Sequence, residues 1–417
     1  MSIPQSHKFI LRGLLFLIMA YSFLVPLENF IEVVWGIKTV FRPHRVLALL
    51  TGFLIFAVVP VHQLRYDRND LRLFWFYLLG LIPTAIAWMY DRLEWSYFIQ
   101  TSIQWLIIVW IFLQAKTLYW NERSVMKLLY AFITASMING LFMIYWFLNK
   151  DISRQNGFMD NPNFAAFTLN IAFIYFIQHG SFVQHQNVLS RIFVSLIGIA
   201  LSLGAILVSG SRGALIAVIL TLLVFLFYRF SLKRLAIFGI LLLCASVVLQ
   251  VTGMRAKYTE AIPLLSRLDR LSGRNESRLV LWEQGWLAFQ DSYCMGLGIE
   301  QFKNPVNYSQ YMQHADNPMV AKQQGLVLHN DFLAILFEYG VLSFIVYLIF
   351  FITLGRQILK ITDFHQRRFW LLVYLNVLTF MFFSTTFQSH AVWFVILLLS
   401  MITGSMTQEK RLNTTLD

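Results

Sequence analysis

The sequence has little charge and almost no cysteine. Charged residues make up 13% of its 417 positions, against roughly 25% in a soluble domain. The two cysteines, Cys244 in an apolar run and Cys294 in a polar stretch, form neither a disulfide framework nor a CxxC zinc motif. With 58% hydrophobic residues and so few charges, the chain is not a water-soluble globule, and redox or zinc chemistry is disfavoured.

Long apolar runs take the place of the missing charges. A helix needs about 20 apolar residues to cross a hydrocarbon core of about 30 Å, and the runs are too long and continuous for barrel strands. The first run is expected to be a retained span, because no small-residue cleavage site follows it. The sequence therefore predicts an all-α polytopic membrane protein with both termini on one side and twelve spans, near 9–27, 46–61, 72–90, 97–115, 126–148, 163–178, 191–208, 213–229, 235–252, 332–354, 369–386 and 389–405.

The remaining charges are unevenly distributed between the predicted loops. Lys and Arg number 33 and Asp and Glu 21, which gives a formal net charge of +12. Basic loops are retained in the cytoplasm. We therefore place inside the loops that contain Lys8, Arg12, Arg65, Arg68, Arg72, Lys116, Arg123, Lys127, Arg191, Arg229, Lys233, Arg234, Arg356, Lys360, Arg367, Arg368, Lys410 and Arg411. Most of the excess is then an orientation signal, and nucleic acid is not required as a partner.

One outer loop, over about 252–328, is much longer than the others, and long loops tend to carry function. Its stretch 277–290 has large apolar side chains at helical spacing, namely Leu279, Trp282, Trp286 and Phe289. This pattern predicts an amphipathic helix in the outer membrane interface, although the aromatic stripe alone is typical of packing. Arg278 is different, because one turn before Trp282 it would lie at the depth of lipid phosphates.

A very short outer turn at 208–214 reads Val-Ser-Gly-Ser-Arg-Gly-Ala. Its glycines allow a tight reversal and close approach of a ligand to the backbone. Arg212 lies at the membrane boundary with no acidic residue near it in the sequence. Snorkelling to the interface would explain an arginine here, but it would not require a Gly-Ser-Arg-Gly turn.

The long loop ends in His329-Asn330-Asp331 at the start of the tenth predicted span. Asn330 or Asp331 would cap that helix. An imidazole at this depth can titrate near neutral pH and act as a base, although a single histidine is more often structural. Glu338, seven residues after Asp331, lies on about the same helix face and is costly in a span unless it has a partner.

A fourth outer motif, over 151–166, contains Arg154, Gly157 and Asn161-Pro162-Asn163 before an apolar run. Turn and capping chemistry explains the asparagines, and Arg154 with these amides could equally bind sugar hydroxyls or phosphate.

The outer arginines share one chemistry. They lie on the same predicted side as His329, without a carboxylate pair or a Cys or His cluster, and they are Arg154, Arg212, Arg274 and Arg278. Arginine suits bidentate contact with phosphate oxygens. An arginine-rich outer cavity without metal ligands predicts a ligand with phosphate at headgroup depth, such as a lipid diphosphate.

In order and spacing, these motifs resemble the O-antigen ligase and polymerase family of bacterial envelopes. The resemblance extends over 150–345 and implies a membrane-embedded, C-type glycosyltransferase fold with one long periplasmic loop. It rests on Arg154 with Gly157 and Asn161-Pro162-Asn163, on Ser211-Arg212-Gly213-Ala214, on Ser272-Gly273-Arg274 through Arg278 and Trp282 to Gly296-Leu297-Gly298, and on His329-Asn330 with Glu338-Tyr339-Gly340.

The resemblance implies transfer of a glycan from undecaprenyl diphosphate, at the periplasmic face of the inner membrane, to an outer-core sugar hydroxyl of lipid A-core. Arg212 and Arg278 would hold the diphosphate and His329 would be the catalytic residue on the acceptor side. The implied substrate-binding residues are Arg154, Asn161, Asn163, Arg274, Asn330 and Glu338. Either Arg274 or Arg278 could be the family's arginine, and the spacing to Trp282 favours Arg278.

The chemistry of the residues agrees with this implication. A diphosphate is a good leaving group, so arginines can stabilise its developing charge without a metal or cofactor, and one base suffices for the acceptor hydroxyl. A single displacement of this kind would invert the anomeric centre.

Several alternatives remain open within and outside this family. O-antigen polymerases, which elongate the lipid-linked glycan, and protein O-oligosaccharyltransferases share the motifs. A polytopic transporter would also have many spans, but it would usually show paired ionisable residues at mid-span or matching broken helices. The predicted divisions are N-terminal spans (1–150), spans with Arg/Asn motifs (151–251), the long periplasmic loop (252–330), and C-terminal spans with a cytoplasmic tail (331–417).

Overall fold

The computed structural model describes residues 5–37, 42–59, 67–118, 120–149, 155–182, 187–228, 277–313, 318–322, 324–387 and 389–414. Within these ranges the chain forms helices and no strands, so the described part is all-helical, as the sequence predicts. The first half contains α1 (Gln5–Leu24), η1 (Val25–Leu27), α2 (Phe30–Trp35), α3 (Pro43–Val58), α4 (Arg68–Met89), α5 (Trp95–Thr117), α6 (Glu122–Asn149), α7 (Pro162–Phe182), α8 (Val188–Ser209) and α9 (Arg212–Phe227).

The second half begins with short helices in the long predicted loop and returns to long helices. These elements are α13 (Ser277–Asp291), α14 (Pro305–Asn307), η4 (Tyr308–Met312), α15 (Pro318–Lys322), α16 (Asp331–Ala334), η5 (Ile335–Tyr339), α17 (Gly340–Leu359), α18 (Phe364–Phe383) and α19 (His390–Thr414). A helix overlaps eleven of the twelve predicted spans. The other prediction, 235–252, lies outside the described residues.

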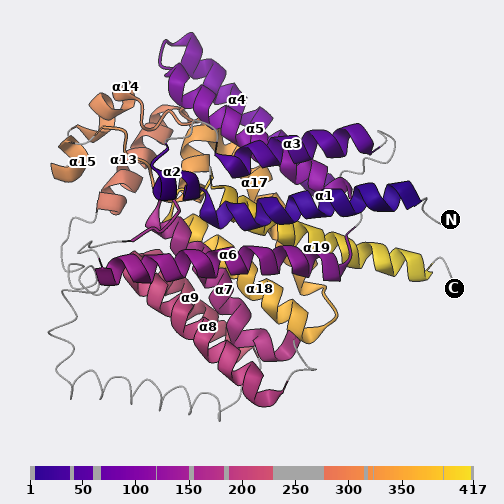
Figure 1. Cartoon of the computed structure of the whole chain (residues 1–417). Coiled ribbons are helices and arrows are strands. Elements are labelled where there is room, and N and C mark those ends of the chain that lie inside the picture. The colour runs from indigo at the N-terminus through magenta and orange to yellow at the C-terminus, as the bar shows by residue number, and fades with distance from the viewer. Residues whose placement is uncertain are drawn as a thin grey trace.

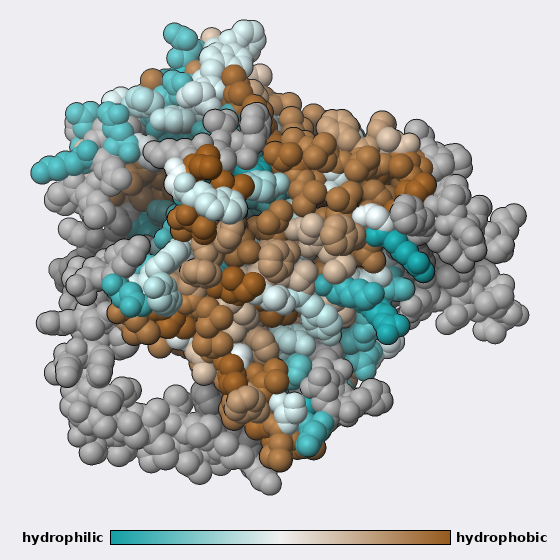
Figure 2. Space-filling view, viewed as in Figure 1, coloured by the Kyte–Doolittle hydropathy of each residue, from teal (hydrophilic) through white to brown (hydrophobic). Residues whose placement is uncertain are grey.

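Within the described part of the chain, five stretches are long and apolar enough to cross a bilayer by length and hydropathy, namely Arg68–Met89, Trp95–Lys116, Glu122–Asn149, Val188–Ser209 and Asp331–Leu359. Shorter apolar helices cover Arg12–Leu27, Pro43–Val58, Arg212–Phe227 and His390–Gly404. The space-filling view has a broad brown surface over the long helices and teal residues toward the ends of the molecule (Figure 2). This distribution fits a multi-pass membrane protein.

Polar side chains start several of these helices. Side-chain oxygens of Glu94, Asn187, Ser211 and Asp363 accept backbone N–H groups in the first turns of α5, α8, α9 and α18. Each side chain accepts a hydrogen bond from an N–H group that the helix itself leaves without a partner. An N–H group without a partner is costly in or near lipid. Short polar sequences between apolar runs therefore define where the helices begin.

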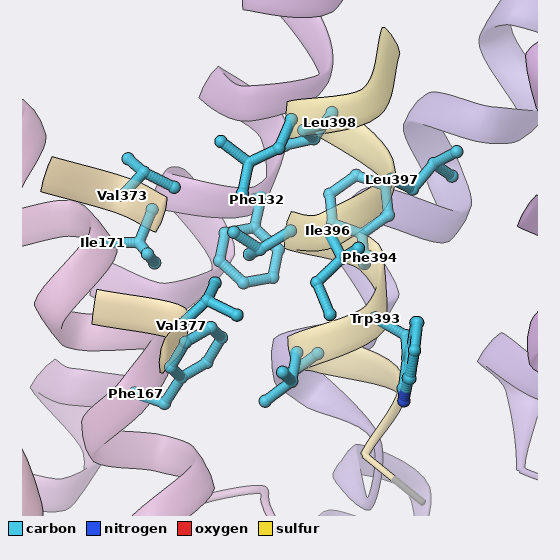
Figure 3. Packing of buried hydrophobic residues seen from close by; sticks show 14 of the residues in the cluster. Phe132, Phe167, Ile171, Val373, Val377, Trp393, Phe394, Ile396, Leu397 and Leu398 are labelled. Atoms are coloured by element: carbon cyan, nitrogen blue, oxygen red, sulfur yellow. The ribbon is translucent and has the colours of Figure 1, made fainter. Parts of the chain in front are cut away.

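The helix α19 forms the centre of the helical bundle. Its residues 391–399 are all buried, and side chains of α6, α7 and α18 surround them. Figure 3 shows Phe132 of α6, Phe167 of α7 and Val377 of α18 facing Phe394 and its neighbours. Because lipid is as apolar as these side chains, close packing rather than escape from water stabilises the contact.

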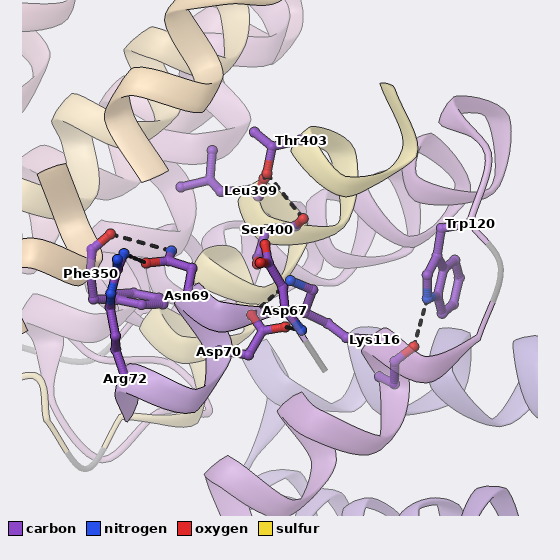
Figure 4. Close-up of polar contacts among 11 residues, drawn as sticks. Asp67, Asn69, Asp70, Arg72, Lys116, Trp120, Phe350, Leu399, Ser400 and Thr403 are labelled. Carbon is purple, nitrogen blue, oxygen red and sulfur yellow. Dashed lines mark hydrogen bonds and ion pairs between the residues drawn. The ribbon is translucent and has the colours of Figure 1, made fainter. Parts of the chain in front are cut away.

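The two ends of the bundle differ in what covers them. The helices α13, α14 and α15 lie together at one end, whereas α1 begins and α19 ends at the opposite end (Figure 1). At the second end, Lys116 of α5 forms an ion pair with Asp70 of α4 (2.7 Å) (Figure 4). Arg72 also donates to Thr353 of α17 (2.7 Å). We call these the loop end and the terminal end.

Two local expectations differ from the structure. The predicted continuous span at 332–354 is interrupted, because η5 is a π-helix and Gly340 has φ +81°. The predicted apolar stripe of α13 is also only partly buried: Phe289 is buried, but Leu279 is 56% and Trp286 47% exposed, and the buried Leu281 lies outside that stripe. The buried face is turned toward η5, since the Phe289 ring lies 5.5 Å from that of Phe337.

Candidate active site at the loop end

His329 lies between α15 and α16 in a backbone conformation that residues other than glycine rarely adopt. Its φ is +52°, in the left-handed region that is uncommon for residues other than glycine. The N–H of His329 donates to Thr385 Oγ1 (3.1 Å), and Trp282 Nε1 donates to the carbonyl of Leu328 (2.7 Å). The residue and its predecessor are therefore held by two other parts of the chain, as is typical of functional positions.

The two residues after His329 anchor the same segment. Asn330 Oδ1 accepts the N–H of the third residue of α16 (3.1 Å), which confirms Asn330 as the cap among the two predicted candidates. The buried carboxylate of Asp331 accepts the N–H groups of Thr386 and the following residue (2.7 and 3.3 Å) and the Thr386 hydroxyl. Hydrogen bonds on both sides therefore fix the backbone that carries the imidazole.

Arg278 lies in the first turn of α13, and the next turn of that helix is tied to the His329 segment. The tie is Trp282, which donates to Leu328 and whose ring packs 5.9 Å from that of Phe382. Arg278 and Trp282 are four residues apart and therefore share a helix face. Arg278 is thus one helical turn from contacts with both the His329 segment and the end of α18.

Arg212 is the first residue of α9, directly after a tight turn at the end of α8. Gly210 has φ +64°, and Ser211 Oγ accepts the N–H of the third residue of α9 (3.3 Å). A Cβ added to Gly213 would lie 3.0 Å from Cβ of Phe383, so the first turn of α9 packs closely on the end of α18. The small residue Gly213 thus allows the helix start that carries Arg212 to pack directly on α18.

The helix starts or segments that carry the three predicted catalytic residues all contact one short segment, residues 382–387, which we call the α18–α19 turn. It contacts α13, α9, His329 and Asp331 through Phe382, Phe383, Thr385 and Thr386, respectively. This segment was not among the sites predicted from the sequence. Its signal is a polar Ser-Thr-Thr run between two apolar spans, which is unnecessary for a simple helical hairpin.

A small cavity beside the His329 segment contains two buried carboxylates, Glu300 and Glu338. Glu338 accepts the N–H groups of Glu300 (3.3 Å) and Phe302 (3.1 Å), and Lys303 Nζ lies 2.8 Å from Glu300. The partner that a carboxylate in a span requires is therefore the backbone of the loop. Substrate contact by Glu338 stays a prediction.

Backbone pairing joins the loop after α13 to η5. The N–H of Leu297 donates to Phe337 O (2.9 Å) and that of Gly298 to Glu338 O (3.0 Å). A Cβ on Gly340 would lie 2.0 Å from a carbonyl oxygen of this loop. Only glycine fits, so the Gly-Leu-Gly and Glu-Tyr-Gly motifs are two sides of one contact.

The remaining predicted substrate-binding residues belong to two segments. Arg154 and Arg274 lie outside the described residues. Asn161 Oδ1 accepts the N–H of Asn163 (2.8 Å), which is ordinary capping at the start of α7. The N–H of Gln155 donates to a carbonyl in the last turn of α8 (3.3 Å), so this segment lies beside the turn that precedes Arg212.

Ion pairs also join the segment before α7 to the N-terminal part of the chain. Arg42 forms ion pairs with Asp160 and with Glu28 (3.4 Å), and the N–H of Asp160 donates to Glu28 Oε1 (3.0 Å). Burial, with the charge of Asp160 nearby, raises the pKa of Glu28 to about 7. This cluster is a second, structural group of charges at the loop end.

The described residues therefore offer cationic and imidazole groups at one end of a helical bundle. Among them, no group of three or more His, Cys, Asp or Glu side chains is placed to hold a metal ion. Arginine side chains can bind phosphate oxygens and an imidazole can accept a proton, which together suit transfer from a phosphorylated donor.

Residues 197–348 match a family model described as O-Antigen ligase. This match supports assignment of the chain to the O-antigen ligase and polymerase family. The match begins in α8, ends in α17 and includes Arg212, Arg278 and His329. Members of the O-antigen ligase family are glycosyltransferase-like enzymes, and the match supports ligase or polymerase activity in general. No curated protein matches the chain.

Proposed function

We propose that the chain is an O-antigen ligase that transfers a glycan from undecaprenyl diphosphate to an outer-core sugar hydroxyl of lipid A-core. The observation that carries the proposal is the attachment of the Arg212, Arg278 and His329 segments to one α18–α19 turn. These segments are distant in sequence, and none requires the others for helix formation. Their shared contact with this turn supports a site that combines phosphate binding with proton acceptance.

Arg212 and Arg278 act on the donor side. As the bond between the anomeric carbon and the diphosphate oxygen breaks, the electron pair moves onto that oxygen. Guanidinium groups stabilise this negative charge and can contact phosphate oxygens in a bidentate manner. Arg154 and Arg274 are proposed to extend the same diphosphate site, and transfer needs no metal.

His329 acts on the acceptor side. The acceptor hydroxyl attacks the anomeric carbon and its proton passes to the imidazole, so the configuration inverts. Because the backbone of His329 is held at Thr385 and Leu328, the base is positioned before substrate binds. Asn330 and Glu338 are proposed to contact the acceptor. Asn161 and Asn163 are proposed to contact glycan hydroxyls near Arg212.

The positions of the termini and of the basic loops support a periplasmic site. The start of α1 and the end of α19 lie at the terminal end (Figure 1), and the loops assigned there by sequence are the basic ones. We therefore propose an inner-membrane protein with both termini in the cytoplasm and the loop end in the periplasm. Donor and acceptor lipids would both reach the site from the outer leaflet.

Deletion of the coding sequence tests the ligase proposal against polymerase activity. Loss of a ligase leaves lipid A-core uncapped while lipid-linked polymer accumulates. Loss of a polymerase instead leaves core that carries a single repeat unit, and this result would overturn the proposal. Complementation with the wild-type chain is the control for effects on neighbouring genes.

A further inference from the structure

A groove lies at the terminal end of α7, α8 and α9, far from the candidate active site. Its volume is about 480 Å³, within the size range of small-molecule sites. Its lining is almost entirely apolar and consists of Phe176, Ile177, Val188, Arg191, Ile192, Ser195, Leu196, Ile199 and Phe225. Among these lining residues, Arg191 alone is charged.

The groove opens on the surface that lipid covers. Val188, Ile192 and Leu196 line it and are 57%, 51% and 60% exposed. Apolar side chains this exposed require a hydrocarbon neighbour. An acyl chain has the shape and polarity to occupy such a channel between helices.

The depth of Arg191 matches a layer of lipid headgroups. Arg191 lies in the first turn of α8, and Gly210 follows the last residue of the same helix. At 1.5 Å per residue they are about 30 Å apart along the axis, the thickness of a hydrocarbon core. Because Gly210 precedes Arg212 at the loop end, Arg191 is at headgroup depth in the opposite leaflet.

Further nitrogen-bearing groups surround this end of the groove. His179, three residues after the lining residue Phe176, lies on about the same face of α7 and is buried. Its Nε2 has no hydrogen-bond partner among the described residues, and neither does Nε2 of the buried Gln178. Arg368 stacks on Phe225 (4.6 Å) and donates to Gln178 Oε1 (3.1 Å). Buried polar groups without a hydrogen-bond partner are costly. The Gln178 amide, and His179 in the tautomer that carries its proton on Nε2, would donate to a bound anion.

We propose that the groove binds an anionic glycerophospholipid of the leaflet opposite the active site. One acyl chain occupies the channel between α7 and α8, and the phosphate lies between Arg191 and His179. A zwitterionic lipid offers the same chain but brings its own cation to this basic site, so it binds less well. This proposal does not depend on which glycan the enzyme transfers.

Native mass spectrometry of the detergent-purified full chain, with equimolar phosphatidylglycerol and phosphatidylethanolamine, tests the site. Wild-type protein is expected to retain phosphatidylglycerol about fivefold over phosphatidylethanolamine, the effect of one basic residue at a headgroup. Arg191→Gln should abolish the preference. The matched control is Arg123→Gln, which removes an exposed arginine from α6 that does not line the groove. Arg123 is at the same end of the bundle, because its neighbour Glu122 accepts a hydrogen bond from Gln366, two residues before Arg368.

A second variant tests the groove itself without changing charge. Ser195→Trp fills the channel and is expected to reduce retention of both lipids while Arg191 is intact. Equal losses in Arg191→Gln and Arg123→Gln would mean nonspecific surface attraction and would overturn the proposal. So would a wild-type protein without preference, or unchanged lipid retention in Ser195→Trp.

Discussion

The terminal and loop ends of the bundle both contain basic residues, but they hold them differently. At the terminal end, Lys116 pairs with Asp70 and Arg72 bonds Asn69 (2.8 Å) and Thr353, so side chains join one helix to the next. At the loop end, backbone N–H groups of His329 and Thr386 donate to the side chains of Thr385 and Asp331, and the backbone of Gly213 approaches the Phe383 side chain. Side-chain pairs thus join one helix to the next at the terminal end, whereas side chains at the loop end bond to the backbone beside the predicted catalytic residues.

This difference separates two meanings of a positive charge in a membrane protein. In the proposed orientation most of the +12 charge is an orientation signal, and at the terminal end basic residues also join helices. Substitution there should lower stability more than activity. At the loop end the order should be reversed, and the following experiments examine that reversal.

The largest effect on transfer is expected from His329→Ala. Loss of the base should lower kcat by about 10²–10⁴-fold, while the apparent unfolding temperature stays close to wild type. The matched variant at the terminal end is Arg72→Ala, which should retain transfer and unfold at a lower temperature. Equal losses of activity in the two variants would contradict the distinction between the ends.

Arg278→Ala and Arg212→Ala should each lower transfer by about 10²-fold, the usual cost of removing one group that stabilises developing charge. Arg278→Lys should restore only part of the activity, because an ammonium group cannot make a bidentate phosphate contact. The measurement is kcat/KM for the lipid-linked donor in purified protein. Full activity in Arg278→Lys would argue for a purely electrostatic role.

Thr385→Val should have a smaller effect, about tenfold on kcat, because it removes the hydroxyl that accepts the His329 N–H without removing a reacting group. Thr385→Ser retains that hydroxyl and should recover most of the activity. A purely packing role would make the isosteric valine variant more active than the serine variant, which is the opposite order.

The smallest effect on transfer is expected from Glu28→Gln, whose main consequence is for stability. Since burial raises the pKa of Glu28 to about 7, the folded state favours the protonated form. Wild-type stability should therefore fall as pH rises from about 4.5 through 7, by about 3 kcal/mol at most. Glu28→Gln should lack this component in unfolding scans from pH 5 to 8, whereas Glu32→Gln, at an exposed position of α2, should follow wild type. Parallel profiles for wild type and Glu28→Gln would refute this explanation.

Helix positions and helix caps, which depend on interactions between residues close in sequence, were predicted from the sequence. Apolar runs of bilayer length predicted eleven helices of the described chain, and the sequence after His329 predicted a cap that proved to be Asn330. The stretch from Ser277 predicted α13, but its buried face depends on contact with Phe337 and could not be deduced from spacing alone.

The parts that escaped prediction are contacts between distant segments. Thr385 and Thr386 meet His329 and Asp331 across more than fifty residues, and a hydroxyl in a turn does not specify its acceptor or donor. Likewise, Gly340 is required by the close approach of the loop after α13 rather than by the helix that contains it. Single-residue patterns identified the chemistry at the loop end, but not the turn that joins it.

The central claim is best tested by reconstituting the purified chain in liposomes with an undecaprenyl-diphosphate-linked glycan and equal amounts of both possible acceptors, lipid A-core and a second lipid-linked glycan. The ligase assignment predicts that glycan appears on lipid A-core with inverted configuration and that His329→Ala forms none. Elongation of the lipid-linked glycan with no modification of lipid A-core would contradict it.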